Sequence, residues 1–178
     1  YVVAALDHTG HGYSEGIPGH VDAFDDYVHD LAEFHRQLAG RFEAAPMLLL
    51  GHSMGGLIAS LYLLRQQSDP EVVKDYVQDP LVFHGKMSAR MVRELFAGMQ
   101  AIQTGAAGIT VPMLILHGGA DSMTSPEGSR FLHEHIGSSD KCLKIFPGLY
   151  HEIFNEPERL EVLQLVLDWC EGRLGETD

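Results

Sequence analysis

The chain has 178 residues, of which 45% are hydrophobic and 21% are charged, and this composition excludes disordered, collagen-like and coiled-coil proteins. Its formal net charge of −13 argues against a nucleic-acid-binding surface, because affinity for phosphate backbones comes mainly from Lys and Arg. No apolar run approaches the roughly 18 residues that a membrane-spanning helix needs. We therefore expect a single folded domain over residues 1–178 that binds no nucleic acid.

The cysteines bear on the cellular compartment. Cys142 and Cys170 are too few for a disulfide scaffold and have no C-x-x-C spacing, so we expect two buried thiols in a reducing compartment. The start of the chain shows no signal-peptide pattern. The expected localisation is the cytoplasm, with transient contact with a membrane surface left open and the oligomeric state undetermined.

The first predicted elements are a strand, a loop and a helix. An apolar strand over residues 1–6 stops at the turn-rich segment 7–12. From Asp22 onward apolar residues recur at helical spacing, with Asp22 placed to cap the helix and Gly40 near its end. This pattern predicts a surface helix that packs one face inward.

Three further apolar runs predict strands of a parallel sheet. Residues 46–50 form a short unbroken run, which is typical of a strand covered on both faces, and residues 54–64 then follow a helical pattern. Residues 111–116 and 142–146 predict two more strands, each followed by a loop and a helix. Strands that alternate with helices indicate an open, mostly parallel α/β sheet, whose ligands lie beyond the carboxyl ends of the strands.

The remaining predicted elements are helices, and one segment interrupts the alternation of strands and helices. Ser125 and the segment 155–157 carry N-terminal helix signals, and residues 88–103 predict a helix with one broad apolar face. The polar stretch that begins at Gln66 leads into no clear strand. The alternation of strands and helices is therefore interrupted there.

A candidate nucleophile follows the second predicted strand. Gly51–Gly55 matches G-x-S-x-G, in which small residues permit a strained turn that exposes the serine hydroxyl between a strand and a helix. A second match, around Ser14, lies in a loop, so only Ser53 has the expected setting. The Met54 amide at the start of the next helix is the natural donor to a developing oxyanion.

The base and the acid that such a serine needs are found at two other strand ends. Asp121 follows the predicted strand 111–116 through a tight turn, and His151 follows the strand 142–146 through another. Glu127 is the nearest competing carboxylate, but a position in the first turn of a helix explains it better. The order Ser, Asp, His is that of α/β-hydrolases.

These residues resemble the monoacylglycerol lipase and lysophospholipase group of α/β-hydrolases. The matching pieces span most of the chain: Asp7–Gly16, Gly51–Gly56, Val111–Asp121 and Tyr150–Glu156. The resemblance implies an α/β-hydrolase fold with Ser53 as nucleophile, Asp121 as acid and His151 as base. This agrees with the placement reached from the strand ends.

The chain also departs from this family. Members carry an earlier strand whose His-Gly motif supplies a second oxyanion donor, and a strand directly after the nucleophile helix that leads into a cap. Both are absent from this sequence, and residues 66–104 resemble only a remnant of the cap and the helix that follows it. We expect an internal segment to be missing near residues 65–70, or else a truncated relative.

The sequence thus predicts a serine carboxylic-ester hydrolase that cleaves monoacylglycerol-like lipids through an acyl-enzyme on Ser53. No metal or organic cofactor is needed, and Asp7, His8 and His11 are interpreted as a rigid turn rather than a metal site. The alternatives are a related lysophospholipase, thioesterase or peptidase, and a non-catalytic protein of the same fold. Acyl length and head group stay undetermined.

Overall fold

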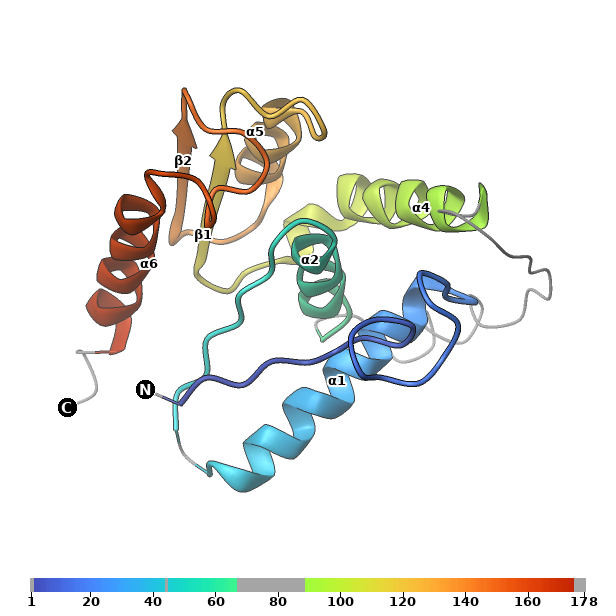
Figure 1. Cartoon of the computed structure of the whole chain (residues 1–178). Coiled ribbons are helices and arrows are strands. Elements are labelled where there is room, and N and C mark those ends of the chain that lie inside the picture. The colour runs from blue at the N-terminus through green and yellow to red at the C-terminus, as the bar shows by residue number, and fades with distance from the viewer. Residues whose placement is uncertain (1, 44, 67–88, 175–178) are drawn as a thin grey trace. The chain divides into compact units, whose positions relative to one another are not determined.

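The computed structural model describes residues 2–43, 45–66 and 89–174. These residues form two compact units, Tyr1–Gly105 and Ala106–Asp178, and each is described by itself (Figure 1). The expected segment break near residues 65–70 and the first part of the predicted cap remnant lie outside the described residues.

The first unit is helical over its described residues. It contains α1 (Phe24–Arg41), α2 (Met54–Gln66) and α4 (Ala89–Gly105), which confirms the three helices predicted for this part of the chain. The predicted cap of α1 is wrong: the N-cap is Ala23, whose amide donates to the Asp26 carboxylate at 3.1 Å. Asp22 lies beside the His20 ring instead.

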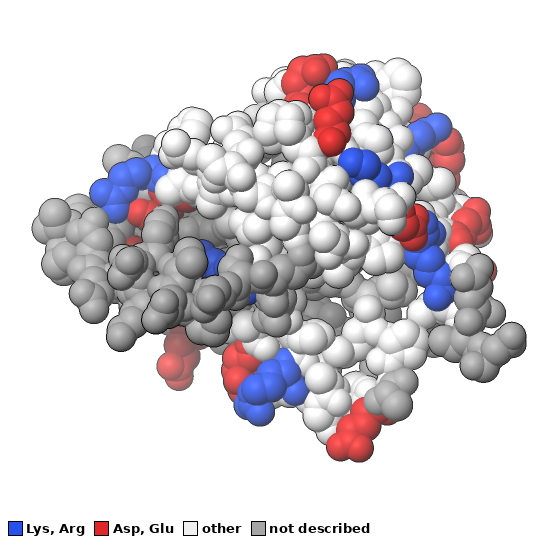
Figure 2. All heavy atoms as spheres, turned by 180° about the vertical axis from the view of Figure 1, so that it is seen from behind, with Lys and Arg blue, Asp and Glu red and all other residues white. Residues whose placement is uncertain are grey.

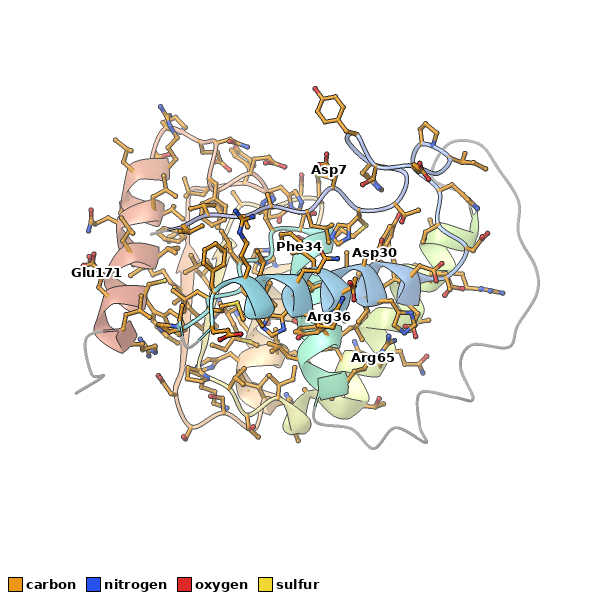
Figure 3. The ribbon with its side chains drawn as sticks, turned by 90° about the horizontal axis from the view of Figure 1, so that it is seen from below. Asp7, Asp30, Phe34, Arg36, Arg65 and Glu171 are labelled. Carbon is orange, nitrogen blue, oxygen red and sulfur yellow. The ribbon has the colours of Figure 1, made fainter. Side chains whose placement is uncertain are left out.

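The core of this unit lies where the N-terminal half of α1 meets α2 and α4. The apolar side chains that are at most 9% exposed there are Val21, Phe24, Tyr27, Val28, Leu31, Ile58, Leu61, Tyr62 and Ile102. The loop before α1 is hydrogen-bonded to this helix, since the backbone amide and hydroxyl of Thr9 both donate to Asp30. Asp30 is labelled on α1 in Figure 3. Asp7, labelled in the same view, accepts a hydrogen bond from the Tyr13 amide at 3.0 Å.

Two predicted strands of the first unit do not form there. Residues 2–6 and 46–50 have no strand assignment, and their apolar side chains are exposed, Val3 by 91% and Leu50 by 67%. A strand requires a neighbouring strand to satisfy its backbone groups. Within the described residues of this unit there is no other strand to pair with them, so the sequence pattern alone does not produce a ladder.

The apolar face predicted for the helix over 88–103 is only partly buried. Ile102 is buried, but Phe96 is 66% exposed and Met99 43% exposed. The α4 surface that packs on α2 is instead formed at glycine: a Cβ at Gly98 would lie 3.2 to 3.3 Å from Leu61 and Leu57. The absence of a side chain at Gly98 therefore allows the two helices to approach closely at this position.

The second unit is a parallel α/β structure. Strands β1 (Met113–Gly118) and β2 (Lys141–Phe146) pair in parallel, with Leu114 opposite Cys142 and Gly118 opposite Phe146. Helix α5 (Pro126–His135) connects the strands, and α6 (Arg159–Leu174) follows β2, so that the sheet is flanked by helices (Figure 1). This confirms both strands and the parallel arrangement predicted for this part of the chain.

Local signals fix most of these boundaries. Ser125 is the N-cap of α5, and its side chain accepts from the Glu127 amide, as predicted. Helix α6 begins at Arg159, two residues beyond the predicted start signal at 155–157. The core joins the end of β2 to α6 through Phe146, Leu149, Ile153 and Val162. The prediction of two buried thiols is wrong, because Cys142 is exposed and Cys170 half-buried.

Several basic side chains on the described surface are paired with acidic ones. On the face shown in Figure 2, described Lys and Arg side chains lie beside Asp or Glu rather than in one cluster. Among the described residues, ion pairs join Arg36 to Glu33, Arg130 to Glu127 and Arg173 to Asp140. No helix of the described residues is long and apolar enough to span a bilayer.

Candidate active site

Ser53 occupies a strained turn at the start of α2. Its φ of 54° lies in the left-handed region, and it is the only residue other than glycine with a positive φ in the described part of the chain. The turn closes tightly, since a Cβ at Gly51 would lie 2.7 Å from the Gly55 carbonyl carbon and 2.8 Å from Gly56 Cα. Backbone strain of this kind is typical of functional sites.

The second serine motif has a different environment. Ser14 lies in a loop of turns, and its hydroxyl donates to the Asp7 carbonyl oxygen at 2.5 Å. No helix begins directly after Ser14, so no row of N-terminal amides faces its hydroxyl. The distinction made from the sequence between Ser53 and Ser14 is supported by these two local geometries.

Asp121 lies just beyond β1, and its carboxylate is surrounded by hydrogen-bond donors. Its Oδ1 accepts from the amides of Met123 at 2.8 Å and Thr124 at 3.0 Å, and its Oδ2 accepts from the Thr124 hydroxyl at 2.7 Å. The side chain is only 3% exposed. Burial by itself raises the pKa of Asp121, but hydrogen bonds from His151, Thr124 and Met123 outweigh burial and hold this pKa well below its usual range. The carboxylate is therefore ionised at neutral pH.

His151 follows β2 and meets Asp121. The His151 Nδ1 atom lies 2.8 Å from Asp121 Oδ2, although the two residues are 30 positions apart in the sequence. Because the ionised carboxylate only accepts, Nδ1 of His151 carries the proton and donates it. In the neutral ring Nε2 is then the acceptor nitrogen, which is the tautomer that a general base requires.

Backbone hydrogen bonds join the loops that carry this pair. The Gly119 amide donates to the Phe146 carbonyl at 2.7 Å, and the Ala120 amide donates to the Leu149 carbonyl at 2.9 Å. Gly118 is required here, since a side chain would collide with the carbonyl oxygens of Leu149 and Tyr150. Glu156 completes the loop by accepting from the Tyr150 amide at 2.9 and 3.0 Å.

The structure thus brings together Asp121 and His151 of the predicted triad. Ser53 and the Met54 amide lie in the first unit, so their relation to this pair stays a prediction. Glu127, the competing carboxylate, is on the first turn of α5 and pairs with Arg130. Sequence analysis missed His117, which lies beside Asp121; the only available signal was its position at the end of the β1 run.

Comparison with known proteins identifies the class. A crystal structure of Paleococcus ferrophilus monoacylglycerol lipase has a TM-score of 0.72 to this chain and 27% sequence identity, and the match covers 90% of this chain and 79% of that one. Together with the parallel sheet and its flanking helices, this similarity confirms the predicted α/β-hydrolase fold.

The particular family follows from sequence. The serine aminopeptidase S33 family matches residues 1–69 and 66–158, and the chain belongs to this family of hydrolases. Monoacylglycerol lipase of Mycolicibacterium smegmatis is 33% identical, covering 97% of this chain and 79% of the relative. Caffeoylshikimate esterase of Arabidopsis thaliana is 26% identical, covering 98% and 70%. The predicted enzyme class, a carboxylic-ester hydrolase, is confirmed.

The alignments also bear on the internal segment that we expect to be missing. The alignment with the Mycolicibacterium relative spans 221 residues, whereas this chain has 178, so at least 43 aligned positions (221 minus 178) have no counterpart here. The family match is split into two parts that meet at residues 66–69. The position of this split agrees with the gap expected near residues 65–70, whereas the alignment length does not locate the unmatched positions.

Proposed function

We propose that this chain hydrolyses the acyl ester of monoacylglycerol-like lipids through an acyl-enzyme formed on Ser53. The observation that carries the proposal is the hydrogen bond from His151 Nδ1 to the ionised Asp121, because it prepares the imidazole to act as a base. The strained position of Ser53 directly before α2 supports the assignment of the nucleophile.

The reaction proceeds in two halves. In the first, His151 Nε2 takes the Ser53 proton while Oγ attacks the ester carbonyl, and the Met54 amide donates to the resulting oxyanion. The imidazolium then gives its proton to the leaving glycerol oxygen, which breaks the ester bond. In the second half, His151 takes a proton from water, the water attacks the acyl-enzyme, and the fatty acid leaves as Ser53 regains its proton.

Asp121 acts on His151 rather than on the substrate. Its negative charge stabilises the imidazolium that forms in both halves, and its hydrogen bond keeps Nδ1 protonated. The donors from Thr124 and Met123 hold the carboxylate in its ionised form, so that Asp121 does not take the proton itself.

The lipid substrate is inferred from relatives. The Mycolicibacterium protein and the Paleococcus structure are both named monoacylglycerol lipase, and both matches extend over at least 90% of this chain. The Arabidopsis relative is named for a caffeoyl ester, which shows that related chains differ in the ester they cleave. We therefore place monoacylglycerols first among substrates.

The test compares hydrolysis of monoacylglycerols and of short-chain nitrophenyl esters by the wild-type protein, Ser53→Ala and Ser14→Ala. We expect Ser53→Ala to abolish hydrolysis of both ester types and labelling by a fluorophosphonate, and Ser14→Ala to retain both. If only Ser14→Ala lost activity, the assignment of Ser53 as the nucleophile would be wrong. A folded wild-type protein that neither hydrolyses nor becomes labelled would point to the non-catalytic alternative.

A peptidase is the second candidate, since the family is described as a serine aminopeptidase. The same triad cleaves amides when the site stabilises an amine leaving group. Aminoacyl nitroanilides distinguish the two: we expect no more than trace hydrolysis of these amides by a protein that cleaves monoacylglycerols. Lysophospholipids and acyl thioesters, assayed beside them, test the remaining alternatives.

A further inference from the structure

A second imidazole lies against the carboxylate of the proposed acid. His117 is the fifth residue of β1, and its Nε2 lies 3.2 Å from Asp121 Oδ2 and 3.2 Å from the Thr124 carbonyl oxygen. Its Nδ1 lies 2.7 Å from the Ser129 hydroxyl on α5. The side chain is 13% exposed, so these contacts are largely removed from water.

The partners of His117 fix where its proton lies. Both neighbours of Nε2 are acceptors, a carboxylate and a carbonyl, so Nε2 carries a hydrogen. In the neutral ring Nδ1 then accepts a hydrogen bond from the Ser129 hydroxyl. The imidazole therefore spans from α5 to the Asp121 loop with each nitrogen engaged.

The contact with Thr124 connects His117 to the acid. Thr124 donates to Asp121 twice, once from its amide and once from its hydroxyl, and His117 holds the carbonyl of that same residue. Asp121 Oδ2 is in turn the atom that His151 contacts. A chain of hydrogen bonds thus runs from Ser129 on α5 through His117 and Thr124 to the carboxylate.

We propose that His117 is a positioning residue that fixes the Asp121 carboxylate against His151. This inference rests on the proposed function, because it assigns His117 a role in orienting the proposed base. The Nε2–H group of His117 holds the Thr124 carbonyl oxygen, and Thr124 in turn donates to both oxygens of Asp121, so the ring fixes the residue that orients the carboxylate. Oδ2 is thereby kept in the position in which it accepts from His151 Nδ1.

Two substitutions separate the Nε2 contact from the bulk of the ring. His117→Phe keeps a planar ring and removes both nitrogens, whereas His117→Gln places an amide donor near the position of Nε2. We expect His117→Phe to lower kcat about tenfold with KM unchanged, because the ester itself does not touch this residue. We expect His117→Gln to restore kcat to within about twofold of wild type. His135→Gln, an exposed change on α5, is the matched control and keeps wild-type activity.

A double-mutant cycle tests whether His117 acts through Asp121. In the Asp121→Asn background we expect His117→Phe to change the residual kcat by less than about twofold, since the carboxylate that His117 positions is gone. An equal tenfold loss in both backgrounds would show a general structural effect and overturn the proposal. Equal losses in His117→Phe and His117→Gln would overturn it as well.

Two further measurements test the proposal even if the His117→Phe protein does not fold. Should His117→Phe not fold, Ser129→Ala removes the anchor of Nδ1 and is expected to lower kcat about threefold, again only when Asp121 is present. Proton NMR of the Nδ1–H of His151, identified by its change in Asp121→Asn, reports the contact without catalysis. We expect this resonance to be unchanged in His117→Gln and displaced in His117→Phe or Ser129→Ala; an unchanged resonance in all three overturns the inference. If the wild-type protein cleaves no ester, the proposed function fails, whereas this resonance still decides the role of His117.

Discussion

The serine turn and the acid–base pair reach their geometry in opposite ways. Ser53 is placed by its own backbone, through a positive φ, a crowded Gly51 and the start of α2, all within a few residues. Asp121 and His151 are placed by hydrogen bonds between loops 30 residues apart in sequence. The comparison teaches that the geometry of the candidate nucleophile can be encoded locally, whereas the orientation of the candidate base needs tertiary contacts.

The largest effect is expected from Asp121→Asn, which removes the carboxylate that His151 contacts. Asp121→Asn presents an amide that no longer requires Nδ1 of His151 to donate, so the imidazole loses its preferred tautomer. We expect kcat to fall about 10⁴-fold with the fold retained, measured by ester hydrolysis and circular dichroism. Asp140→Asn, which disrupts only a surface pair with Arg173, is the control. Activity within tenfold of wild type in Asp121→Asn would remove Asp121 from the mechanism.

The next largest effect is expected from a substitution in the turn that carries Ser53. Gly51→Ala introduces a Cβ that collides with the backbone of Gly55 and Gly56, and these atoms cannot move without opening the turn. We expect kcat to fall about 100-fold and the free energy of unfolding to fall by about 1–3 kcal/mol. The matched control is Gly55→Ala, where nothing lies within 4 Å of the added carbon, and we expect it to keep both quantities near wild type. Equal behaviour of the two variants would contradict the steric account.

The dependence of stability on pH isolates the buried carboxylate. Burial raises the pKa of Asp121, yet hydrogen bonds from His151, Thr124 and Met123 bring the folded-state pKa below the ordinary value of 3.8. A lowered folded-state pKa contributes stability that is present above the ordinary pKa and is lost as the pH falls through the folded-state value. We expect the wild-type advantage in unfolding free energy over Asp121→Asn to shrink steadily below pH 3.8, as urea unfolding would measure.

Surface acids do not obscure this difference. Hydrogen bonds from Arg36 and Gln37 lower the pKa of Glu33 to about 2, and its contribution has the same sign. Because Glu33 is unchanged in Asp121→Asn, its effect cancels between the two proteins. A difference that stays constant from neutral pH to below 3.8 would show that the carboxylate of Asp121 is not stabilised by its donors.

The smallest effect is expected from Glu156→Ala, which weakens the loop that carries His151. Glu156→Ala removes the carboxylate that accepts from the Tyr150 amide, next to His151. We expect the free energy of unfolding to fall by about 1 kcal/mol and kcat to fall several-fold, with KM unchanged. Glu158→Ala, at an exposed neighbouring position, is the control. Similar kcat values in the two variants would show that the loop is held without Glu156.

The same contrast explains which elements the sequence predicts correctly. Helices α1, α2, α4 and α5 follow from apolar periodicity and end signals that lie within each segment. The runs 2–6 and 46–50 have the composition of strands but form no ladder, since a ladder requires a partner that the segment itself does not contain. The runs over β1 and β2 succeed because each supplies the partner of the other.

The sequence by itself determined the identity of the candidate residues and their order. The serine motif, the two strand-end positions and the resemblance to α/β-hydrolases all depend on residue type and spacing along the chain. Only the tertiary structure decided that Asp121 Oδ2 meets His151 Nδ1, that Thr124 and Met123 keep the carboxylate ionised, and that His117 lies beside it. These contacts join side chains from separate loops, and hydrogen-bond geometry of that kind depends on distances in space, which spacing in the sequence does not specify.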